Sequence, residues 1–312
     1  MAPSAIETTS GVESPLQMRA ETLSARELNM KDAHVVASLG LFVIHNVIRR
    51  NLASCSSGAL TVSSTSSSAG LDKDPFLTYA SYTIFTVTDH FDALDTIWFP
   101  AFTGYDKRFQ SQIDQHDSVV RPELVALQTA VERARAAPAT DKQAWQAVSD
   151  HFARLLALIE PIFDLEEQLS NGLGHRVPIS EIRSLEKQQE SRRQDAVKVY
   201  GNLWSACFLL RSMTKGEKEV FPPGLPRVVA NGMMTAGAVK YGRELKSSEH
   251  TRCLLDWNGF NTFRSPLVGQ NLASAIIVWQ PHHVFQCLSD WFCFWKVKGR
   301  ASQTWHPIAL SQ

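Results

Sequence analysis

Apolar side chains recur at the spacing of an α-helix through four long segments of this chain, and no other feature constrains the fold as strongly. In the second segment, Ile84, Val87 and Phe91 fall on one stripe when successive residues are turned by about 100°. A stripe of this kind is the face that a helix buries against its neighbours. The four segments cover residues 32–52, 75–102, 107–136 and 141–170.

The connections between these segments contain turn-forming residues. Residues 53–70 are rich in serine and predict a loop, and Asn171-Gly172 is typical of a helix end. Strand patterns are few, and the sequence has no internal repeat. Four long helices joined in this way predict an all-α fold with an antiparallel four-helix core over about residues 32–214.

The remaining parts of the chain predict further helices and a tail. Helical patterns cover residues 179–214 and 228–245, so additional C-terminal helices should pack on the core. The polar segment 1–28, rich in Ser, Thr and Glu, predicts a disordered N-terminal tail. Residues 29–312 are then expected to form a single α-helical domain.

The composition excludes several classes of protein. Lys+Arg and Asp+Glu both number 31, which predicts no nucleic-acid-binding surface. The five cysteines form no CxxC pair, and the N-terminus lacks the basic and apolar regions of a signal peptide. No apolar run reaches the roughly 18 residues of a membrane span. We therefore expect a cytoplasmic protein with reduced thiols.

Three aspartates at intervals of three residues make the second helix the most informative segment. Asp92 and Asp95, preceded by Asp89, are neighbours along one side of a helix, at the edge of its apolar stripe. Two carboxylates so placed repel each other, and a cation would relieve the repulsion. The pattern predicts either a cation site or a solvated helix edge.

Over roughly residues 34–170 the chain resembles hemerythrin-like (HHE) proteins. His45, in the segment HNVIRR, matches an iron-ligating histidine of that family's first helix. His90 with Phe99-Pro100 matches its HHxxEExxxFP segment, and His116 matches the start of its HxxxH pair. Residues 163–167, with the sequence FDLEE, resemble its HFxxEE segment. The resemblance implies a four-helix bundle.

Several metal ligands of the hemerythrin-like family are replaced in this chain. The carboxylate expected four residues after His90 falls on Leu94, and the second histidine of the HxxxH pair falls on Val120. The histidine expected before Phe163 falls on Ile162. The candidate iron ligands that the resemblance leaves are His45, His90, His116 and Glu166 or Glu167.

The segment Asp92-Ala93-Leu94-Asp95, with Asp89 before it, also resembles the DDxxD/E motif of class I terpene cyclases. Carboxylates of that motif hold Mg²⁺, which holds the diphosphate of the substrate and makes it a better leaving group. The resemblance implies that Asp92 and Asp95 bind Mg²⁺. Asp89, Glu166 and Glu167 would assist as further metal-binding residues.

Aromatic residues beside this motif fit the same chemistry. A carbocation formed on loss of diphosphate must be shielded from water and faced by aromatic rings. Phe91 and Trp98 lie close to the aspartates in the sequence and would line such a pocket. The second cyclase motif, NDxxSxxxE, is absent in standard form.

The segment DHFDALDTIWFP, the replaced iron ligands and the length of the chain are together similar to the humulene synthases of fungal tropolone-sesquiterpenoid pathways. The similarity implies a Mg²⁺-dependent sesquiterpene cyclase that converts farnesyl diphosphate to a macrocyclic product such as α-humulene. Its partner would be this small prenyl diphosphate, and analogy suggests a homodimer. The implied catalytic residues are Asp92, Asp95, Phe91 and Trp98.

Two alternatives belong to other classes of function. A hemerythrin-like protein would bind non-heme iron through His45, His90, His116 and Glu167. A helical bundle that has lost its metal would act as an interaction module, with neither metal nor turnover.

Overall fold

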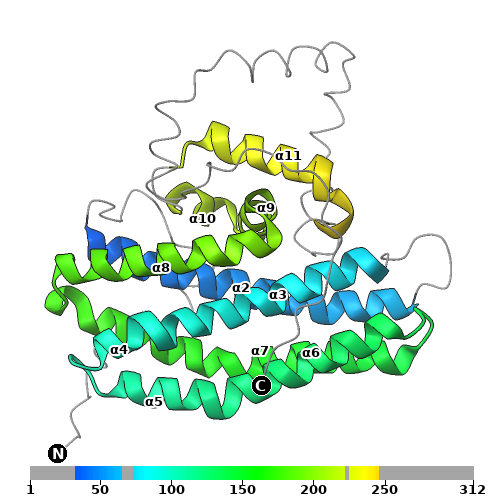
Figure 1. Cartoon of the computed structure of the whole chain (residues 1–312), viewed down its shortest axis with the longest axis horizontal. Helices are drawn as coiled ribbons and strands as arrows, with labels where there is room; N and C mark the ends of the chain where they lie inside the picture. Colours follow the sequence, from blue (N-terminus) through cyan, green and yellow to red (C-terminus); the bar gives the residue numbers. More distant parts are fainter. Residues whose placement is uncertain (1–31, 65–72, 222–224, 246–312) are drawn as a thin grey trace, which may run out of the picture. The chain divides into compact units, whose positions relative to one another are not determined.

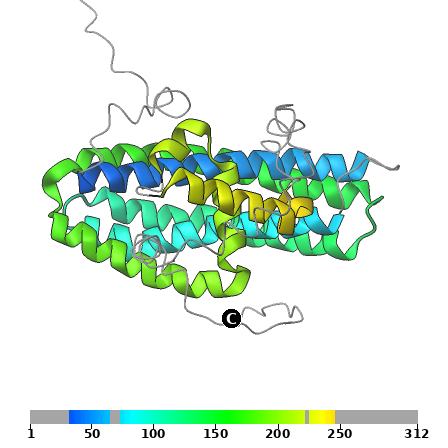
Figure 2. The same cartoon turned by 90° about the horizontal axis from the view of Figure 1, so that it is seen from above.

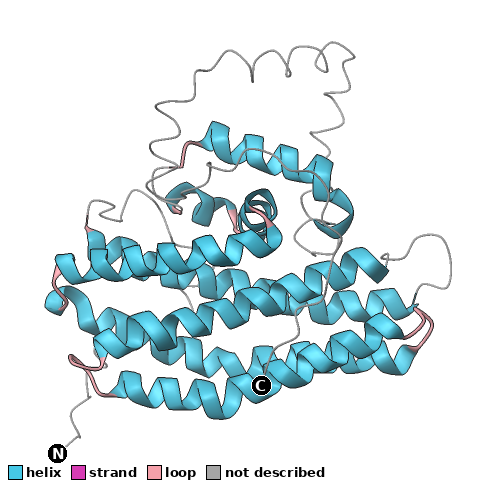
Figure 3. Cartoon of the chain, viewed as in Figure 1, coloured by secondary structure: helices cyan, strands magenta, loops and turns pink. Residues whose placement is uncertain are grey.

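The structure, a computed structural model, describes residues 32–64, 73–221 and 225–245. Among these residues there are helices and short connections but no strand, so the predicted all-α fold is confirmed (Figure 3). The chain divides into one unit over residues 1–266 and another over residues 267–312, and every described residue belongs to the first. The predicted tail over residues 1–28 and the end of the predicted domain lie outside the described residues.

Four long helical rods surround the core, as predicted (Figure 1). Contacts between the first and second, second and third, third and fourth, and fourth and first rods close the bundle, and successive rods are antiparallel. None of the described helices is long and apolar enough to span a lipid bilayer. The rods are α2 (Ala33–Ser64); α3 (Lys73–Ala93) with η1 (Leu94–Trp98) and α4 (Phe99–Phe102); α5 (Arg108–Gln115) with η2 (His116–Val120) and α6 (Arg121–Ala136); and α7 (Lys142–Leu173).

Shorter helices follow the bundle. α8 packs against α2, and α11 packs against α9 and α3 (Figure 2). The single helix predicted over residues 179–214 is divided because Gly201 adopts a φ of 83°, a conformation that glycine tolerates and that ends a helix. These elements are η3 (Gly174–Arg176), α8 (Ile179–Tyr200), α9 (Asn202–Ser212), α10 (Lys215–Val220) and α11 (Arg227–Leu245).

The serine-rich segment predicted as a loop is helical as far as Ser64, so this part of the prediction was wrong. The hydroxyls of Ser57 and Thr61 each donate to the backbone carbonyl four residues earlier, at 3.1 Å, which satisfies them within the helix. Cys55 and Ala59 meanwhile have no exposed surface. Burial of this small-residue face therefore outweighs the weak helix propensity of serine.

The fourth rod begins and ends close to the predicted residues. The side chain of Asp141 accepts a hydrogen bond from the backbone N–H of Ala144 at 3.1 Å and caps the start of α7. Gly174, with a φ of 49°, follows the last residue of the helix, Leu173. This N-terminal cap fixes the start of the helix that carries Glu166.

The apolar core of the bundle consists of two clusters. Phe91 and Phe163 belong to the first, and Leu94 and Leu169 belong to the second, although both pairs lie on the second and fourth rods. Polar residues of α3 and α7 lie between these positions, among them Glu166, whose side chain is fully buried. The junction of the two clusters is therefore a polar centre inside an otherwise apolar bundle.

Candidate metal centre

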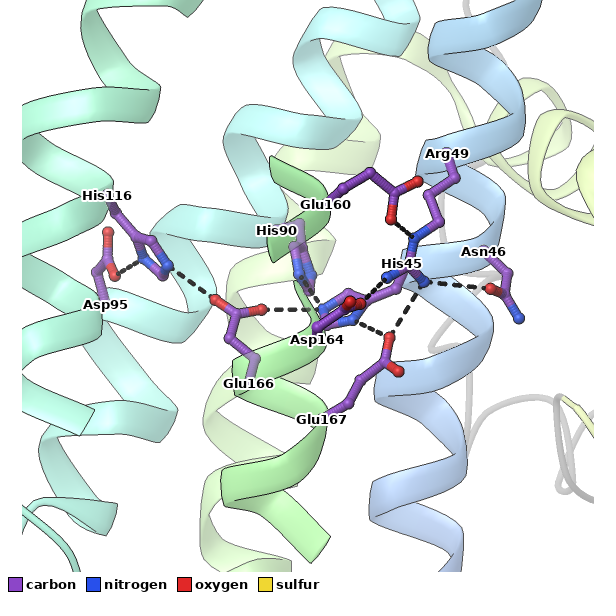
Figure 4. A network of polar contacts seen from close by, with 10 residues as sticks. All are labelled: His45, Asn46, Arg49, His90, Asp95, His116, Glu160, Asp164, Glu166 and Glu167. Atoms are coloured by element: carbon purple, nitrogen blue, oxygen red, sulfur yellow. Dashed lines mark hydrogen bonds and ion pairs between the residues drawn. The ribbon is translucent and has the colours of Figure 1, made fainter. Parts of the chain in front are cut away.

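Three side chains from three different rods bring ligand atoms to one place at this junction (Figure 4). His45 lies on α2, His90 on α3 and Glu166 on α7. One ligand atom of each lies within 4.8 Å of the other two. Two imidazoles and a carboxylate are ligands that proteins use for iron and zinc.

The orientation of His45 is set by a neighbouring carboxylate. Its Nδ1 lies 2.9 Å from Oε1 of Glu167, and because a carboxylate only accepts, Nδ1 carries the hydrogen. In the neutral ring, Nε2 then presents a lone pair, 3.1 Å from Nε2 of His90 and 3.1 Å from Oε2 of Glu166. The ring also stacks on Phe163, with 3.7 Å between the ring centroids, which fixes its plane.

The buried carboxylate of Glu166 contacts two imidazoles. Oε1 lies 2.8 Å from Nε2 of His116, and Oε2 lies 3.1 Å from Nε2 of His45. Because Nδ1 of His45 carries the hydrogen, Oε2 and the lone pair of His45 face each other with no proton between them, which is costly for a buried carboxylate. A divalent cation would satisfy both, so the residues present fit a metal.

The pKa values at the centre favour the protonation states that metal ligands need. Burial, together with the neighbouring imidazole of His45, lowers the pKa of His90 to about 3, so its ring is neutral. Burial would raise the pKa of Glu166, but contacts with His116 and His45 outweigh it and lower that pKa to about 2. A neutral imidazole and an ionised carboxylate are ready to bind a metal without losing protons.

Arg49, one turn after His45 on α2, supports this side of the centre. Its Nη1 donates to Oε1 of Glu167 at 3.1 Å, and its other nitrogens contact Glu160 at 2.9 Å and Asp164 at 3.3 Å. Glu167 is therefore held between an arginine and a histidine. Carboxylates that hold the far nitrogen of a metal-binding histidine in this way fix its tautomer and its direction.

On the other side of Glu166 lies His116, the first residue of η2. Its Nδ1 donates to Oδ1 of Asp95 at 2.6 Å, and its Nε2 lies 2.8 Å from Oε1 of Glu166. Burial would lower the pKa of His116, but the carboxylates of Asp95 and Glu166 outweigh it and raise that pKa to about 9. Without a metal, a charged imidazolium therefore offsets part of the negative charge of Glu166.

Asp89 and Asp92 of α3 lie on a partly exposed face, which we call the aspartate face (Asp89 and Asp92 with Arg121 and Arg192). Oδ1 of Asp92 accepts a hydrogen bond from Arg121 at 2.7 Å, and Oδ2 accepts one from Arg192 at 2.9 Å. Asp89 accepts from Arg192 at 3.3 Å. Guanidinium groups thus relieve the repulsion from which a cation site was predicted.

The sequence was compared with known proteins. No family model and no solved structure matches it. The xanthocillin biosynthesis cluster protein F of Aspergillus fumigatus is 44% identical over 232 residues, which are 73% of this chain and 98% of that protein. This chain belongs to the family of cluster protein F.

In this member of the cluster protein F family, the structure separates the predicted metal-binding residues into two groups. Glu166 and Glu167 lie at the buried centre with the predicted iron ligands His45 and His90. Asp95 reaches the centre only through His116. Asp89 and Asp92 lie on the aspartate face.

The two aromatic residues predicted to line a pocket also differ from each other. Phe91 is fully buried, with its ring centroid 4.5 Å from that of His116 and 5.8 Å from that of Phe163, and forms a wall of the centre. Trp98 is partly exposed, and its Nε1 donates to Gln189 at 2.8 Å. Only Phe91 touches the residues of the metal centre directly.

The arginine partners of these carboxylates are not predicted by the sequence pattern. Arg49, Arg121 and Arg192 each bind two or more acidic side chains. Arg121 and Arg192 are far in sequence from the aspartates of the second rod that they hold. The sequence indicates only that three aspartates on one side of a helix need compensating positive charge. It does not indicate which residues supply that charge.

Proposed function

We propose that this protein binds one divalent transition metal in the centre of its bundle, through His45, His90 and Glu166, and that it serves fungal secondary metabolism. The observation that carries the metal site is the convergence of three ligand atoms within 4.8 Å, at a point where a buried oxygen of Glu166 faces the lone pair of His45. The pathway class is supported by the relative named for a xanthocillin biosynthesis cluster, of which 98% is matched.

The chemistry of the ligands favours iron(II). Mg²⁺ takes oxygen ligands, whereas two imidazoles with one carboxylate form the set that non-heme iron enzymes use, with positions left open. Iron held in this way supplies open coordination positions for a small-molecule substrate or dioxygen. The site has only three ligands from this chain, which suits a reactive centre better than a closed structural one.

The residues around the three ligands orient them and shield the centre. Glu167 keeps the hydrogen of His45 on Nδ1, which leaves Nε2 directed at the metal position. Phe91 and Phe163 cover the centre with apolar surface and exclude water from that side. Arg49 balances Glu167 and keeps the added negative charge of the second carboxylate from repelling Glu166.

The metal site is tested by measuring metal content. We expect about one iron per chain after anaerobic reconstitution, measured by inductively coupled plasma mass spectrometry, and near-complete loss in Glu166→Gln. The matched control is Glu160→Gln, the same change on the same helix at a side chain that is 36% exposed, and it should keep its metal. A wild-type protein that binds no iron, zinc or cobalt would refute the proposal.

A second candidate function is the Mg²⁺-dependent sesquiterpene cyclase. The observation that favours it is the aspartate face, where Asp89 and Asp92 and two arginines lie together on a partly exposed surface. If Mg²⁺ were held by Asp92 and Asp95, the guanidinium groups they release would be available to the diphosphate of a prenyl substrate. The predicted role of Mg²⁺ and the predicted homodimer belong to this candidate.

This candidate makes a different prediction from the first. Purified protein incubated with farnesyl diphosphate and Mg²⁺ should release a hydrocarbon of sesquiterpene mass, detected by gas chromatography–mass spectrometry. Asp92→Ala should abolish the product while the iron content of the protein stays unchanged. If farnesyl, geranyl and geranylgeranyl diphosphate are all inert, the cyclase is excluded, and a protein that also binds no metal is the interaction module.

A further inference from the structure

Glu166 lies between two series of contacts that have the same chemical order. In each series an arginine holds a carboxylate, the carboxylate holds Nδ1 of a histidine, and Nε2 of that histidine lies against one oxygen of Glu166. Figure 4 shows both histidines, their carboxylates and Arg49. The two series are Arg49–Glu167–His45, which ends at Oε2, and Arg121–Asp95–His116, which ends at Oε1.

We infer that Asp95 is a positioning residue of the metal centre and not one of its ligands: Asp95, held by Arg121, directs His116 against Glu166 and so sets the direction of that carboxylate. The inference rests on the proposed metal site at His45, His90 and Glu166. It assigns to Asp95 a role different from the Mg²⁺ ligand that the sequence implies.

The contacts of Asp95 support a positioning role. Its side chain is 7% exposed, and each of its oxygens already accepts a short hydrogen bond from a strong donor. Oδ1 accepts from His116 at 2.6 Å, and Oδ2 accepts from Arg121 at 2.7 Å. Charge-assisted contacts of this length are among the strongest that a carboxylate makes. Asp95 also lies outside the group of atoms that converge on the metal position.

A π turn of the backbone explains how two donors of one helical rod reach the same carboxylate. The backbone N–H of Arg121 donates to the carbonyl of His116, five residues earlier. In an α-helix, side chains five residues apart point about 140° away from each other. The wider π turn brings them nearer to one face, where both meet Asp95. Asp95 itself lies on the other π turn, η1.

The consequence for the metal is geometric. His116 lies 2.8 Å from Oε1 of Glu166, while Oε2 lies 3.1 Å from His45. Holding Oε1 in place leaves Oε2 directed at the metal position. Removal of a partner that orients a metal ligand typically weakens metal binding by about 10- to 100-fold without changing the ligands themselves.

The test is a titration of the full-length protein with Co²⁺, monitored by the visible absorption bands of the bound ion. We compare the wild type with Asp95→Ala, Asp95→Asn and Asp117→Asn. Asparagine keeps an oxygen that accepts from His116, so it should retain part of the function. The matched control is Asp117, which binds the same Arg121 at 2.7 Å but is 64% exposed, and whose side chain forms no hydrogen bond or ion pair with a histidine among the described residues.

We expect Asp95→Ala to weaken Co²⁺ binding by about 10- to 100-fold, Asp95→Asn to weaken it less, and Asp117→Asn to leave it unchanged. The band positions should stay constant, since the ligands are the same. Asp95→Ala with wild-type affinity would overturn the inference. Equal losses in both Asp95 variants, with shifted bands, would show instead that Asp95 is a ligand.

Failure of the proposed function looks different from failure of this inference. If the wild type itself binds no Co²⁺, Fe²⁺ or Zn²⁺, the metal site is refuted and the inference falls with it. If the wild type binds and only the Asp95 variants behave unexpectedly, the metal site stands. Circular dichroism of each variant confirms that the helices are intact, and Asp95→Asn, the nearly isosteric change, keeps the test decisive if Asp95→Ala does not fold.

Discussion

The buried candidate metal centre and the aspartate face lie on neighbouring parts of the same helices and contain the same kind of acidic side chain, yet their charges are balanced in different ways. On the aspartate face, guanidinium groups neutralise Asp89 and Asp92, whose side chains are both 31% exposed. At the centre, Glu166 is fully buried, and its oxygens face imidazoles instead: His116 at 2.8 Å and His45 at 3.1 Å.

The difference shows that burial, more than the number of acidic residues, distinguishes a candidate metal site from an ordinary charged surface. Water screens exposed carboxylates, and a flexible arginine is enough to pair them. A buried carboxylate beside a histidine lone pair needs a cation held in a fixed geometry. The aspartate-rich motif is the more visible feature of the sequence, whereas the histidines spread over three rods form the more constrained site.

The largest expected effect is stabilisation by a transition metal at the centre. Co²⁺ at about 1,000 times its dissociation constant should raise the free energy of unfolding by about 4 kcal/mol. The effect should vanish in His90→Ala and persist in Asp92→Asn, because only the first removes a ligand. Thermal unfolding with and without Co²⁺, and after EDTA, measures it. A shift that disappears in Asp92→Asn would move the metal to the aspartate face.

The next largest effect concerns Arg49, whose side chain is only 10% exposed and which contacts Glu160, Asp164 and the buried Glu167. Removing one partner of a buried ion pair leaves an uncompensated charge and typically costs about 3–5 kcal/mol. Arg49→Met, which keeps much of the apolar stem, should therefore lower the free energy of unfolding by about 3 kcal/mol. Urea denaturation of the metal-free protein measures the change.

The control for Arg49 is Glu160→Gln, which removes only its most exposed partner, and it should cost less than about 1 kcal/mol. Equal costs for the two variants would mean that the buried contact to Glu167 contributes no more than the exposed one. Burial would then make no difference to how much an ion pair of Arg49 contributes to stability.

The stability of the metal-free protein should depend on pH in two opposite ways, both from the centre. The pKa of His116 is raised from 6.5 to about 9, so the folded state holds the extra proton in that interval and stability falls as pH rises through it. The pKa of His90 is lowered from 6.5 to about 3, so the unfolded state holds the extra proton there and stability falls as pH drops.

The combined contribution of these two histidines to stability should therefore be greatest near pH 6.5. The melting temperature of EDTA-treated protein, recorded across the pH range, measures it. His116→Gln should remove the decrease on the alkaline side and leave the acidic side. An alkaline decrease that survives in His116→Gln would assign it to another group.

Much of the fold followed from the sequence because local signals and packing agree. The apolar stripe of α3 and the cap at Asp141 predicted elements that the structure contains. The resemblance to hemerythrin-like proteins named His45, His90 and His116 before their positions were known, and the structure places all three around Glu166. His45 and His90 are predictable because each lies on an α-helix at a spacing that the resemblance supplies, whereas the π turn that begins at His116 is not.

The remaining features depend on interactions between distant segments. The π turn at His116 shifts the register by an amount that no apolar periodicity reveals, and it brings Arg121 onto the same face. Serines of α2 were assigned to a loop because their propensity is local, whereas the burial of Cys55 is tertiary. The pairing of Arg192 with Asp89 and Asp92 joins residues about a hundred positions apart.

The smallest expected effect belongs to this last pair and completes the comparison. Arg192 is 34% exposed and contacts Asp89 and Asp92 at 3.3 and 2.9 Å, geometry that in water contributes about 0–1 kcal/mol. Arg192→Met should therefore change the free energy of unfolding by less than about 1 kcal/mol, and that change should shrink in 1 M salt, where the screening length is about 3 Å. A double-mutant cycle with Asp92→Asn isolates the pair from other effects of each substitution. A coupling above about 2 kcal/mol, unchanged by salt, is expected only of a desolvated pair, and it would mean that the aspartate face behaves like the buried centre.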